Sequence, residues 1–390
     1  MQYRKFGQLD WQVSALGFGC MRLPSTGDNN ANIDEPEATK MLHYAIDQGV
    51  NYVDTAYPYH GGNSERFVGR ALKGGYRDKV KLATKLPTWL TKEYSDFDKY
   101  LNEQLKKLQT DHIDFYLLHA LNGERWPTLK EIGVFDWAEK AIADGRIRHL
   151  GFSFHDNYSV FEQIINDYDK WTFCQIQYNY IDVENQAGTK GLQYAASKGL
   201  AVVIMEPLLG GKLVNPPPPI QQLWDSAPSQ RSPADWALQW LWNQPEVSLV
   251  LSGMSTFAQV EENIASAGVS QVNLLHAEAE QQIIDQVRLK YQELSPIPCT
   301  KCEYCLPCPN GVNIPRNFDV YNEGVMYDKI DQSRQAYSWW IPDLERAEVC
   351  IQCLECEQLC PQQIPISEWM PHIHAVLGEG KAIADVPRPK

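Results

Sequence analysis

The sequence lacks long hydrophobic runs, an excess of basic residues and, over most of its length, cysteine. No run of about 18 apolar residues occurs that could cross a membrane, and the N-terminus lacks the apolar core of a signal peptide. Acidic residues outnumber basic ones by 49 to 35, a formal net charge of −14, which argues against binding to nucleic acid or anionic membranes. We therefore expect a cytoplasmic protein without nucleic-acid or membrane partners.

Cysteine is nearly absent from the first 298 residues, which hold only Cys20 and Cys174. The other eight of the ten cysteines lie between Cys299 and Cys360. In a chain without a secretory signal, such a cluster favours metal binding over disulfide bonds. Because the chain has 390 residues, of which 44% are hydrophobic, it is long enough for two domains. We interpret the cysteine-rich segment as a metal-binding domain that follows a larger one.

The chain before these cysteines alternates short β-branched apolar runs with longer amphipathic stretches. This alternation predicts parallel strands joined by helices, and eight repeats in about 285 residues predict a (β/α)8 TIM barrel of the α/β class. A doubly wound sheet is the alternative, but the glycine-rich phosphate-binding turn is absent after the first strand. The opening segment Tyr3–Val13 predicts a β-hairpin that plugs the bottom of the barrel. The predicted strands are Ala15–Gly19, Asn51–Ala56, Val80–Leu86, Ile113–Ala120, Ile147–Phe154, Phe173–Tyr178, Leu200–Pro207 and Val247–Gly253. The predicted helices lie near residues 35–49, 63–72, 94–109, 127–143, 157–168, 186–197, 232–243 and 276–293.

Two proline-containing segments interrupt this rhythm. Residues 209–231 include four consecutive prolines, Pro216–Pro219. Because proline disrupts a helix interior, we predict a loop on the catalytic face, which is either a fixed cover or a mobile lid. The second segment, Ser295–Cys299, marks the change to cysteine-rich composition. We place the boundary there, which gives a barrel domain of residues 1–294 and a second domain of residues 295–390.

Four chemically active residues lie at or just after the ends of predicted strands. Asp54 closes the second strand and Tyr59 follows it, Lys85 ends the third strand, and His119 ends the fourth. Because the C-terminal ends of barrel strands face one pocket, these residues should meet there. Taken singly, each has an ordinary structural explanation, such as a buried ion pair between Asp54 and Lys85.

Together the four residues have the chemistry of a proton-transfer site. A cation beside Tyr59 favours the phenolate and lowers the pKa of this tyrosine from its usual value of about 10. Lys85 would supply that charge, Asp54 would hold Lys85 in place, and His119 would orient a carbonyl group or share the proton. We therefore predict a catalytic site of Asp54, Tyr59, Lys85 and His119.

The segment Asn51–Tyr59 (NYVDTAYPY) and its continuation His60–Leu72 (HGGNSERFVGRAL) resemble the signature of the aldo/keto reductase superfamily. With Lys85 and His119 the whole Asp–Tyr–Lys–His tetrad matches, and the resemblance extends over about residues 3–290. It implies an oxidoreductase that transfers a hydride between NADP(H) or NAD(H) and a small carbonyl or alcohol substrate. Tyr59 would be the general acid.

The same resemblance implies a nicotinamide-binding site. Ser153 and Gln175 would hold the carboxamide, and the loop and helix after the eighth strand would hold the adenosine end. Met205 stands where many members stack a tyrosine on the nicotinamide. Gly253 and Gln259 stand where one major branch has a Lys and an Arg for the 2′-phosphate. The implied cofactor-binding residues are Ser153, Gln175, Met205, Gly253, Ser255, Gln259, Glu262 and Asn263.

Four residues near the strand ends allow two interpretations. His155 and Glu206 are either further site residues or part of a hydrogen-bonded pocket wall. Trp89 and Trp126, soon after the third and fourth strands, either line an apolar pocket or pack in the core.

The clustered cysteines form two blocks of four. The first block has the spacing C-x2-C-x2-C-x2-C-P, and the second has C-x2-C-x2-C-x3-C-P. The second is the bacterial ferredoxin run, in which three close thiolates hold one cluster and the fourth cysteine ligates the other. Paired zinc sites are the alternative. We predict two 4Fe-4S clusters, one held by Cys299, Cys302, Cys305 and Cys360 and the other by Cys350, Cys353, Cys356 and Cys308.

The segment between the two blocks predicts helices at Phe318–Tyr327 and Leu344–Cys350. The apolar packing of this segment is assigned to Tyr337, Trp339 and Trp340. It resembles the mainly helical ferredoxin arrangement of respiratory iron–sulfur subunits. The segment Pro298–Val312 resembles the tail of a branch of aldo/keto reductases that carry a 4Fe-4S ferredoxin-type domain.

Three hypotheses for function follow. The first is an iron–sulfur aldo/keto reductase in which the clusters carry electrons, and we expect this one. In the second, a flavin in or near the barrel exchanges electrons, through the clusters, with a one-electron carrier such as ferredoxin or flavodoxin. In the third, the barrel is a non-catalytic scaffold in a redox complex, which the intact tetrad disfavours.

Overall fold

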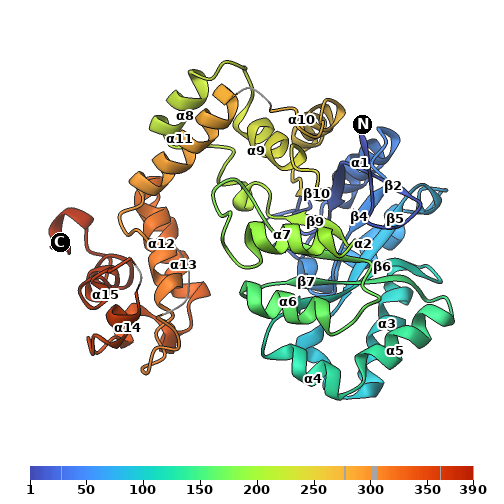
Figure 1. Ribbon diagram of the computed structural model, residues 1–390, viewed down its shortest axis with the longest axis horizontal. Coiled ribbons are helices and arrows are strands. Elements are labelled where there is room, and N and C mark those ends of the chain that lie inside the picture. The colour runs from blue at the N-terminus through green and yellow to red at the C-terminus, as the bar shows by residue number, and fades with distance from the viewer. Residues whose placement is uncertain (28, 276–277, 300–304, 361, 390) are drawn as a thin grey trace. The chain divides into compact units, whose positions relative to one another are not determined.

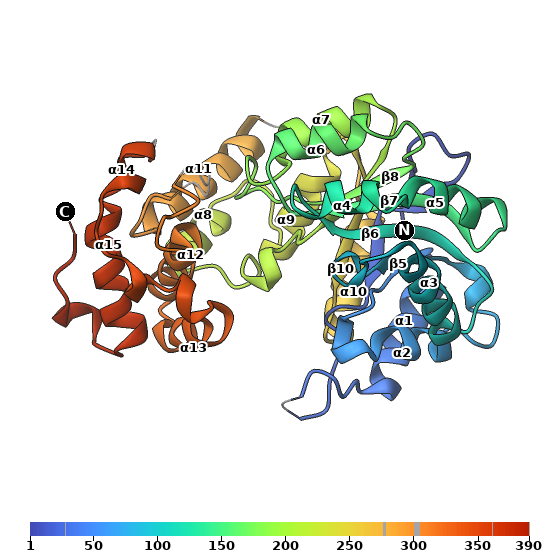
Figure 2. The same ribbon diagram turned by 90° about the horizontal axis from the view of Figure 1, so that it is seen from below.

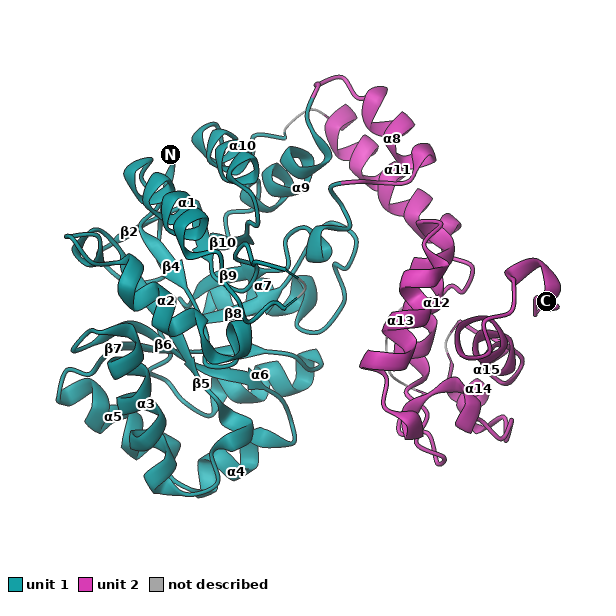
Figure 3. Cartoon of the chain, turned by 180° about the vertical axis from the view of Figure 1, so that it is seen from behind, with its two compact units in different colours: residues 1–214, 231–277 teal, residues 215–230, 278–390 magenta. Residues whose placement is uncertain are grey.

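The chain forms two compact units (Figure 3). The computed structural model describes residues 1–27, 29–275, 278–299, 305–360 and 362–389. The first unit comprises Met1–Val214 and Arg231–Ala277, and the second comprises Asn215–Gln230 and Glu278–Lys390. The domain boundary between residues 294 and 295 stays a prediction.

The first unit is a closed barrel of eight parallel strands, as the sequence predicted (Figure 1). Its strands are buried runs rich in β-branched and aromatic residues, which suit a sheet that is covered on both faces. Spatial neighbours follow chain order, and the last strand closes the barrel by pairing with the first and seventh. The strands are β3 (Leu16–Gly19), β4 (Tyr52–Asp54), β5 (Lys81–Leu86), β6 (Ile113–Leu121), β7 (Ile147–Phe154), β8 (Phe173–Gln177), β9 (Ala201–Met205) and β10 (Val247–Gly253).

Helices that follow the strands surround this barrel (Figure 2). The pattern at residues 127–143 predicted one helix, but two form there because Gly133, with a φ of 88°, interrupts the helical backbone. The helices of this unit are α1 (Glu35–Asp47), α2 (Ser64–Ala71), α3 (Tyr94–Leu108), α4 (Arg125–Glu131), α5 (Val134–Ala143), α6 (Tyr158–Asn166), α7 (Gly188–Ser197), α9 (Pro233–Trp242) and α10 (Phe257–Gly268).

The predicted N-terminal hairpin is present. Strands β1 (Tyr3–Lys5) and β2 (Gln12–Ser14) pair antiparallel. Phe6, in the connection between them, is fully buried, and its ring centroid lies 4.7 Å from that of Phe115 and 5.7 Å from that of Phe173. Because Phe173 begins β8, the hairpin closes the N-terminal end of the barrel.

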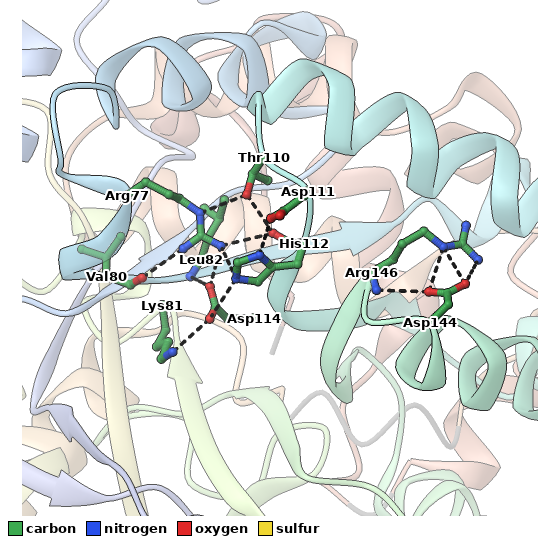
Figure 4. A network of polar contacts seen from close by, with 10 residues as sticks. All are labelled: Arg77, Val80, Lys81, Leu82, Thr110, Asp111, His112, Asp114, Asp144 and Arg146. Atoms are coloured by element: carbon green, nitrogen blue, oxygen red, sulfur yellow. Dashed lines mark hydrogen bonds and ion pairs between the residues drawn. The ribbon is translucent and has the colours of Figure 1, made fainter.

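A network of polar contacts joins the starts of β5 and β6 (Figure 4). The buried Asp114 carboxylate accepts a hydrogen bond from the Leu82 N–H at 3.0 Å and pairs with Arg77 at 2.8 Å and Lys81 at 3.2 Å. Burial raises the pKa of Asp114, but these three partners favour the charged form and hold the pKa below its usual value. The network therefore stabilises the barrel at the end opposite the strand termini that carry the tetrad.

The second unit is mainly helical and has its own apolar core. Phe318, Tyr321, Trp369 and Met370 are among the buried residues of this core. Helix α8 lies beside α11 in both views (Figure 1, Figure 2). Among the described residues of the whole chain, no helix is both long and apolar enough to cross a membrane. The helices are α8 (Pro218–Asp225), α11 (Glu278–Leu294), α12 (Ile314–Met326), α13 (Ile330–Trp340), α14 (Glu355–Leu359) and α15 (Ile366–Ile373).

The prediction of a loop throughout residues 209–231 is wrong. Helix α8 lies within this segment and begins at Pro218, so Pro218 and Pro219 occupy its first turn. Proline is tolerated there because the first backbone N–H groups of a helix have no partner within it. The prolines therefore start a helix instead of preventing one.

Two predictions about the second unit also need correction. Residues Leu344–Cys350 form two short 3-10 helices, Asp343–Glu345 and Ala347–Val349, instead of one helix. Tyr337 is buried as expected, but Trp339 and Trp340 are 75% and 68% exposed. Both lie in the last turn of α13, where only Tyr337 faces the core.

Candidate functional site

A cavity of about 340 Å³ opens at the C-terminal ends of the barrel strands. The structure brings all twelve residues that the sequence predicted for the catalytic and cofactor-binding sites into its wall. These are Asp54, Tyr59, Lys85, His119, Ser153, Gln175, Met205, Gly253, Ser255, Gln259, Glu262 and Asn263. A volume of this size is sufficient for a small ligand, so the predicted residues form one continuous candidate site.

Lys85 lies at the centre of the predicted tetrad. Its Nζ lies 2.6 Å from Asp54 Oδ1, donates to the Thr55 carbonyl oxygen at 2.9 Å and lies 3.3 Å from the Tyr59 hydroxyl. Asp54 and Lys85 are 3% and 1% exposed. The parallel pairing of β4 with β5 places these two strand ends side by side. A buried ion pair thus lies next to the tyrosine hydroxyl.

Burial dominates the electrostatics of this group. It raises the pKa of Tyr59, and Lys85 opposes that rise without reversing it. The expected lowering by Lys85 is therefore present but smaller than the cost of burying a phenolate. Burial alone would lower the pKa of Lys85, but Asp54 and Tyr59 outweigh it and raise the value. At neutral pH the site holds a charged lysine beside a protonated tyrosine.

His119 faces Tyr59 across the cavity. The two rings are nearly perpendicular, with centroids 6.2 Å apart. Burial, with smaller contributions from Lys85, His155 and Arg125, lowers the pKa of His119 well below its usual value, so the imidazole is neutral. Among the described residues, its buried Nδ1 has no hydrogen-bond partner.

The two tryptophans near these strand ends lie in different environments. The Trp89 ring centroid is 5.2 Å from that of His119, so Trp89 stands beside the tetrad. Trp126 is 1% exposed and donates to Asp167 at 2.7 Å, so it belongs to the core.

The residues expected at the nicotinamide end differ in their hydrogen bonding, because Ser153 has a partner and the Gln175 amide oxygen has none within the described part of the chain. The Ser153 hydroxyl oxygen accepts a hydrogen bond from the Ala120 N–H at 2.8 Å, next to His119. Gln175 Nε2 lies 3.6 Å from the sulfur of Met205. The buried Gln175 Oε1 has no partner among the described residues. An unpaired amide oxygen in a cavity wall is a suitable acceptor for a carboxamide N–H.

The residues expected at the adenosine end lie on the loop from β10 to α10 and on the first turns of that helix. Gln259 accepts from the Ser255 N–H at 2.8 Å as part of the helix cap. Glu262 accepts from Ser232 at 2.6 Å, and Asn263 donates to Ser252 at 2.9 Å. These contacts hold the end of the site in a fixed shape.

Sequence reasoning missed Arg22, which also lines the cavity. A side chain at Gly253 would come within 3.2 Å of the Arg22 side chain, and the Arg22 carbonyl accepts from Ser255 at 2.8 Å. Among the described residues, no carboxylate pairs with its guanidinium group. The sequence did contain a signal for Arg22, because a cation just beyond the end of the first barrel strand is expected near the site. His155 and Glu206, whose role the sequence left open, line the same cavity.

The second unit contains a pocket lined by cysteines from both blocks. Cys308 of the first block and Cys350, Cys353 and Cys356 of the second surround it. This is the crossed set that the ferredoxin spacing predicted for one cluster. Four thiols around one pocket, in a unit with an apolar core, fit a 4Fe-4S cluster by their donor chemistry.

The other predicted set is described only in part. Cys299, Cys305 and Cys360 pack against the core of the second unit. Cys302 lies outside the described residues. This ligand set stays a prediction.

Comparison with known proteins identifies the families of both parts of the chain. Residues 15–274 match the aldo/keto reductase family, and residues 298–364 match the 4Fe-4S dicluster domain. The chain therefore belongs to the aldo/keto reductase family. It is an oxidoreductase of that family with a C-terminal 4Fe-4S ferredoxin-type domain.

Individual relatives resemble mainly the barrel. L-galactose dehydrogenase of Arabidopsis thaliana is 29% identical over 311 residues, which cover 72% of this chain and 94% of that protein. The oxidoreductase YqkF of Bacillus subtilis is 28% identical over 304 residues, or 68% and 91% of the two chains. The holo form of aldo-keto reductase AKR11C1 from Bacillus halodurans superposes with a TM-score of 0.61 at 27% identity and covers 74% and 96%. These proteins are matched over nearly their full length, whereas a quarter or more of this chain has no counterpart in them.

Proposed function

We propose that the barrel interconverts a carbonyl compound and its alcohol with a bound NADP(H) or NAD(H). The observation that carries this proposal is the placement of Lys85 between Asp54 and Tyr59 in a cavity that also contains the unpaired Gln175 amide oxygen. The names of relatives include both a dehydrogenase and reductases, which are the two directions of such a reaction.

The residues of the chain would supply binding and proton transfer. When bound, the nicotinamide supplies or accepts the hydride. Ser153 and Gln175 would hold its carboxamide, and Arg22, beside Gly253, would place positive charge near its phosphates. Gly253 and Gln259 leave the 2′-phosphate without the usual basic pair, so the choice between NADP(H) and NAD(H) would depend on the remaining groups.

In the direction of reduction, Tyr59 would donate its hydroxyl proton to the carbonyl oxygen. Because burial raises the pKa of Tyr59, the proton is in place before reaction, and the adjacent Lys85 stabilises the phenolate that forms. Asp54 would keep Lys85 charged and fixed. His119, which is neutral, would orient the carbonyl group by a hydrogen bond.

We further propose that the second unit holds two 4Fe-4S clusters that carry electrons. Cys308, Cys350, Cys353 and Cys356 would hold one, and Cys299, Cys302, Cys305 and Cys360 the other. Ile351 and Leu354, which line the cysteine pocket, are 67% and 49% exposed. An exposed apolar rim beside a cluster suits transient contact with a one-electron carrier such as a ferredoxin or flavodoxin.

Anaerobic purification tests these proposals together. We expect iron and sulfide corresponding to two clusters, and NAD(P)H oxidation that depends on an added aldehyde or ketone. A flavin spectrum without NAD(P)H oxidation would instead support the flavin-coupled alternative. Unchanged activity in the Tyr59→Phe variant would instead support the scaffold alternative.

A further inference from the structure

Arg125 is a half-buried cation that approaches the tetrad through the ring of Trp89. It is the first residue of α4, just after β6 delivers His119. Its Nη1 donates to the Ala120 carbonyl oxygen at 2.8 Å, and its guanidinium carbon lies 5.9 Å from the centre of the Trp89 ring. Trp89 in turn lies against His119. The guanidinium group is therefore one aromatic ring away from the tetrad.

The charge of Arg125 is not neutralised within the part of the chain that the structure describes. No carboxylate there forms an ion pair with it, and its Nε and Nη2 have no acceptor. These two nitrogens form the edge of the guanidinium group that binds a carboxylate with two parallel hydrogen bonds. In a protein with a net charge of −14, a half-buried arginine without an acidic partner is unusual.

The two histidines on this side of the cavity add no charge. His119 and His155 line the cavity, and burial together with Arg125 keeps the pKa of each below its usual value, so both are neutral at pH 7. Trp89 supplies an apolar wall between the cation and the tetrad. Trp89 and Arg125 are not themselves among the residues that line the cavity, but they adjoin it at His119. There a flat apolar surface lies next to one available positive group.

We propose that Arg125 binds a carboxylate on the carbonyl substrate, so that the preferred substrates are carbonyl compounds that carry an acidic group. Trp89 would pack against the body of such a substrate while its carbonyl group reaches Tyr59 and His119. This inference rests on the proposed function of the barrel, which it deepens by naming the substrate class.

Arg125 also has a structural role, which the test must separate from recognition. Ala120 has a φ of 53°, which is rare for a residue other than glycine, and its carbonyl oxygen accepts the Arg125 hydrogen bond. A purely structural arginine would affect every substrate equally. A recognition residue would affect acidic substrates selectively.

The experiment compares 4-carboxybenzaldehyde with the neutral 4-nitrobenzaldehyde as substrates of the holoenzyme. In Arg125→Gln we expect kcat/KM for the carboxylate to fall about 10- to 100-fold, mainly through KM, and that for the nitro compound to change less than about threefold. Arg125→Lys should restore part of the preference. Arg148→Gln, which removes an exposed arginine on β7 away from the cavity, is the matched control and should leave both values unchanged.

A calorimetric titration with benzoate, without added nicotinamide, separates failure of this inference from failure of the proposed function. If no carbonyl compound is reduced but benzoate binding is lost in Arg125→Gln, the anion site stands and the proposed reaction is wrong. If Arg125→Gln changes neither the substrate ratio nor the benzoate titration, or lowers both substrates equally, the inference is overturned.

Discussion

The proposed proton transfer depends on two atoms, the Tyr59 hydroxyl oxygen and Lys85 Nζ. In the proposed mechanism, the 3.3 Å contact between Lys85 Nζ and the Tyr59 hydroxyl connects the buried ion pair with Asp54 to the proton donor. Removal of that hydroxyl should therefore affect catalysis without affecting folding.

Tyr59→Phe should reduce carbonyl turnover by about 10²- to 10⁴-fold, which is the usual contribution of a positioned general acid. The thermal unfolding temperature should change little, because the ring is retained. Steady-state kinetics and a melting curve measure the two effects. Tyr57→Phe is a matched control, because its hydroxyl contacts Glu103 outside the cavity wall. Equal activity of Tyr59→Phe and the wild type would contradict the mechanism.

The pH dependence should differ between the two directions. Since burial raises the pKa of Tyr59, the proton donor is present throughout the neutral range, and reduction should be nearly independent of pH until the alkaline range. Oxidation of the alcohol needs the phenolate and should rise with pH. His119 should add no transition near pH 6.5, because its pKa lies well below that value. Initial rates in both directions from pH 5.5 to 10 test this, and a decline in reduction below pH 7 would contradict the neutral assignment of His119.

At the scale of elements, the two ends of the barrel strands have different roles. The C-terminal ends hold the site, while the N-terminal ends hold the hairpin plug and the Asp114 network. Asp114 stabilises the pairing of β5 with β6, and its contribution is electrostatic, so it should be measurable as a function of pH.

Asp114→Asn should lower the free energy of unfolding by about 3 kcal/mol at pH 7, because Arg77 and Lys81 lose a buried partner. The pKa of Asp114 is lower in the folded state than in the unfolded state, so its stabilisation is present at neutral pH and is lost as the pH falls through the folded-state value. The difference between variant and wild type in urea unfolding should thus shrink below about pH 4. Asp144→Asn, which breaks an exposed pair with Arg146, should cost less than about 1 kcal/mol.

The crossing of ligands between the two cysteine blocks is also testable at this scale. Cys308→Ser should remove the cluster held by the second block and leave about four of the expected eight irons. A further change of Cys356 to Ser should remove no additional iron, because both residues line the same pocket. Iron analysis and electron paramagnetic resonance of the reduced protein measure this, with Cys174→Ala as a control thiol in β8. If the double variant retained clearly less iron than Cys308→Ser, the two cysteines would serve different clusters.

At the scale of the whole molecule, each unit has a core of its own, so loss of iron should affect the two unequally. Removal of the clusters by a chelator should increase hydrogen exchange in residues 298–364 and leave exchange in the barrel strands unchanged. Mass spectrometry of peptides from both units measures this. Increased exchange in β5 or β6 would show that the barrel also depends on the clusters.

The barrel was predictable because its pattern is local. Each strand is an apolar run between turns, and the tetrad follows once parallel strands are assumed to end at one face, so Asp54 and His119 could be placed together from sequence. Arg22 lies in a loop and Arg125 at the start of a helix, so the strand pattern alone did not point to either of them. Arg22 lines the cavity, whereas Arg125 does not. The helix at Pro218 was missed because proline usually disrupts helices, whereas here it occupies the first turn. The exposure of Trp340 was missed because tryptophan is usually buried, whereas here it lies at the end of a helix.

The assignment of Asn215–Gln230 to the second unit has a practical consequence. The chain leaves the barrel unit after β9, contributes α8 to the second unit, returns for α9 to α10, and leaves again before α11. The iron–sulfur unit is thus assembled from two separate stretches of the gene product, with the end of the barrel encoded between them. Transplanting it onto a relative that has only the barrel would require a graft at two places, because a single C-terminal fusion would leave α11 without α8.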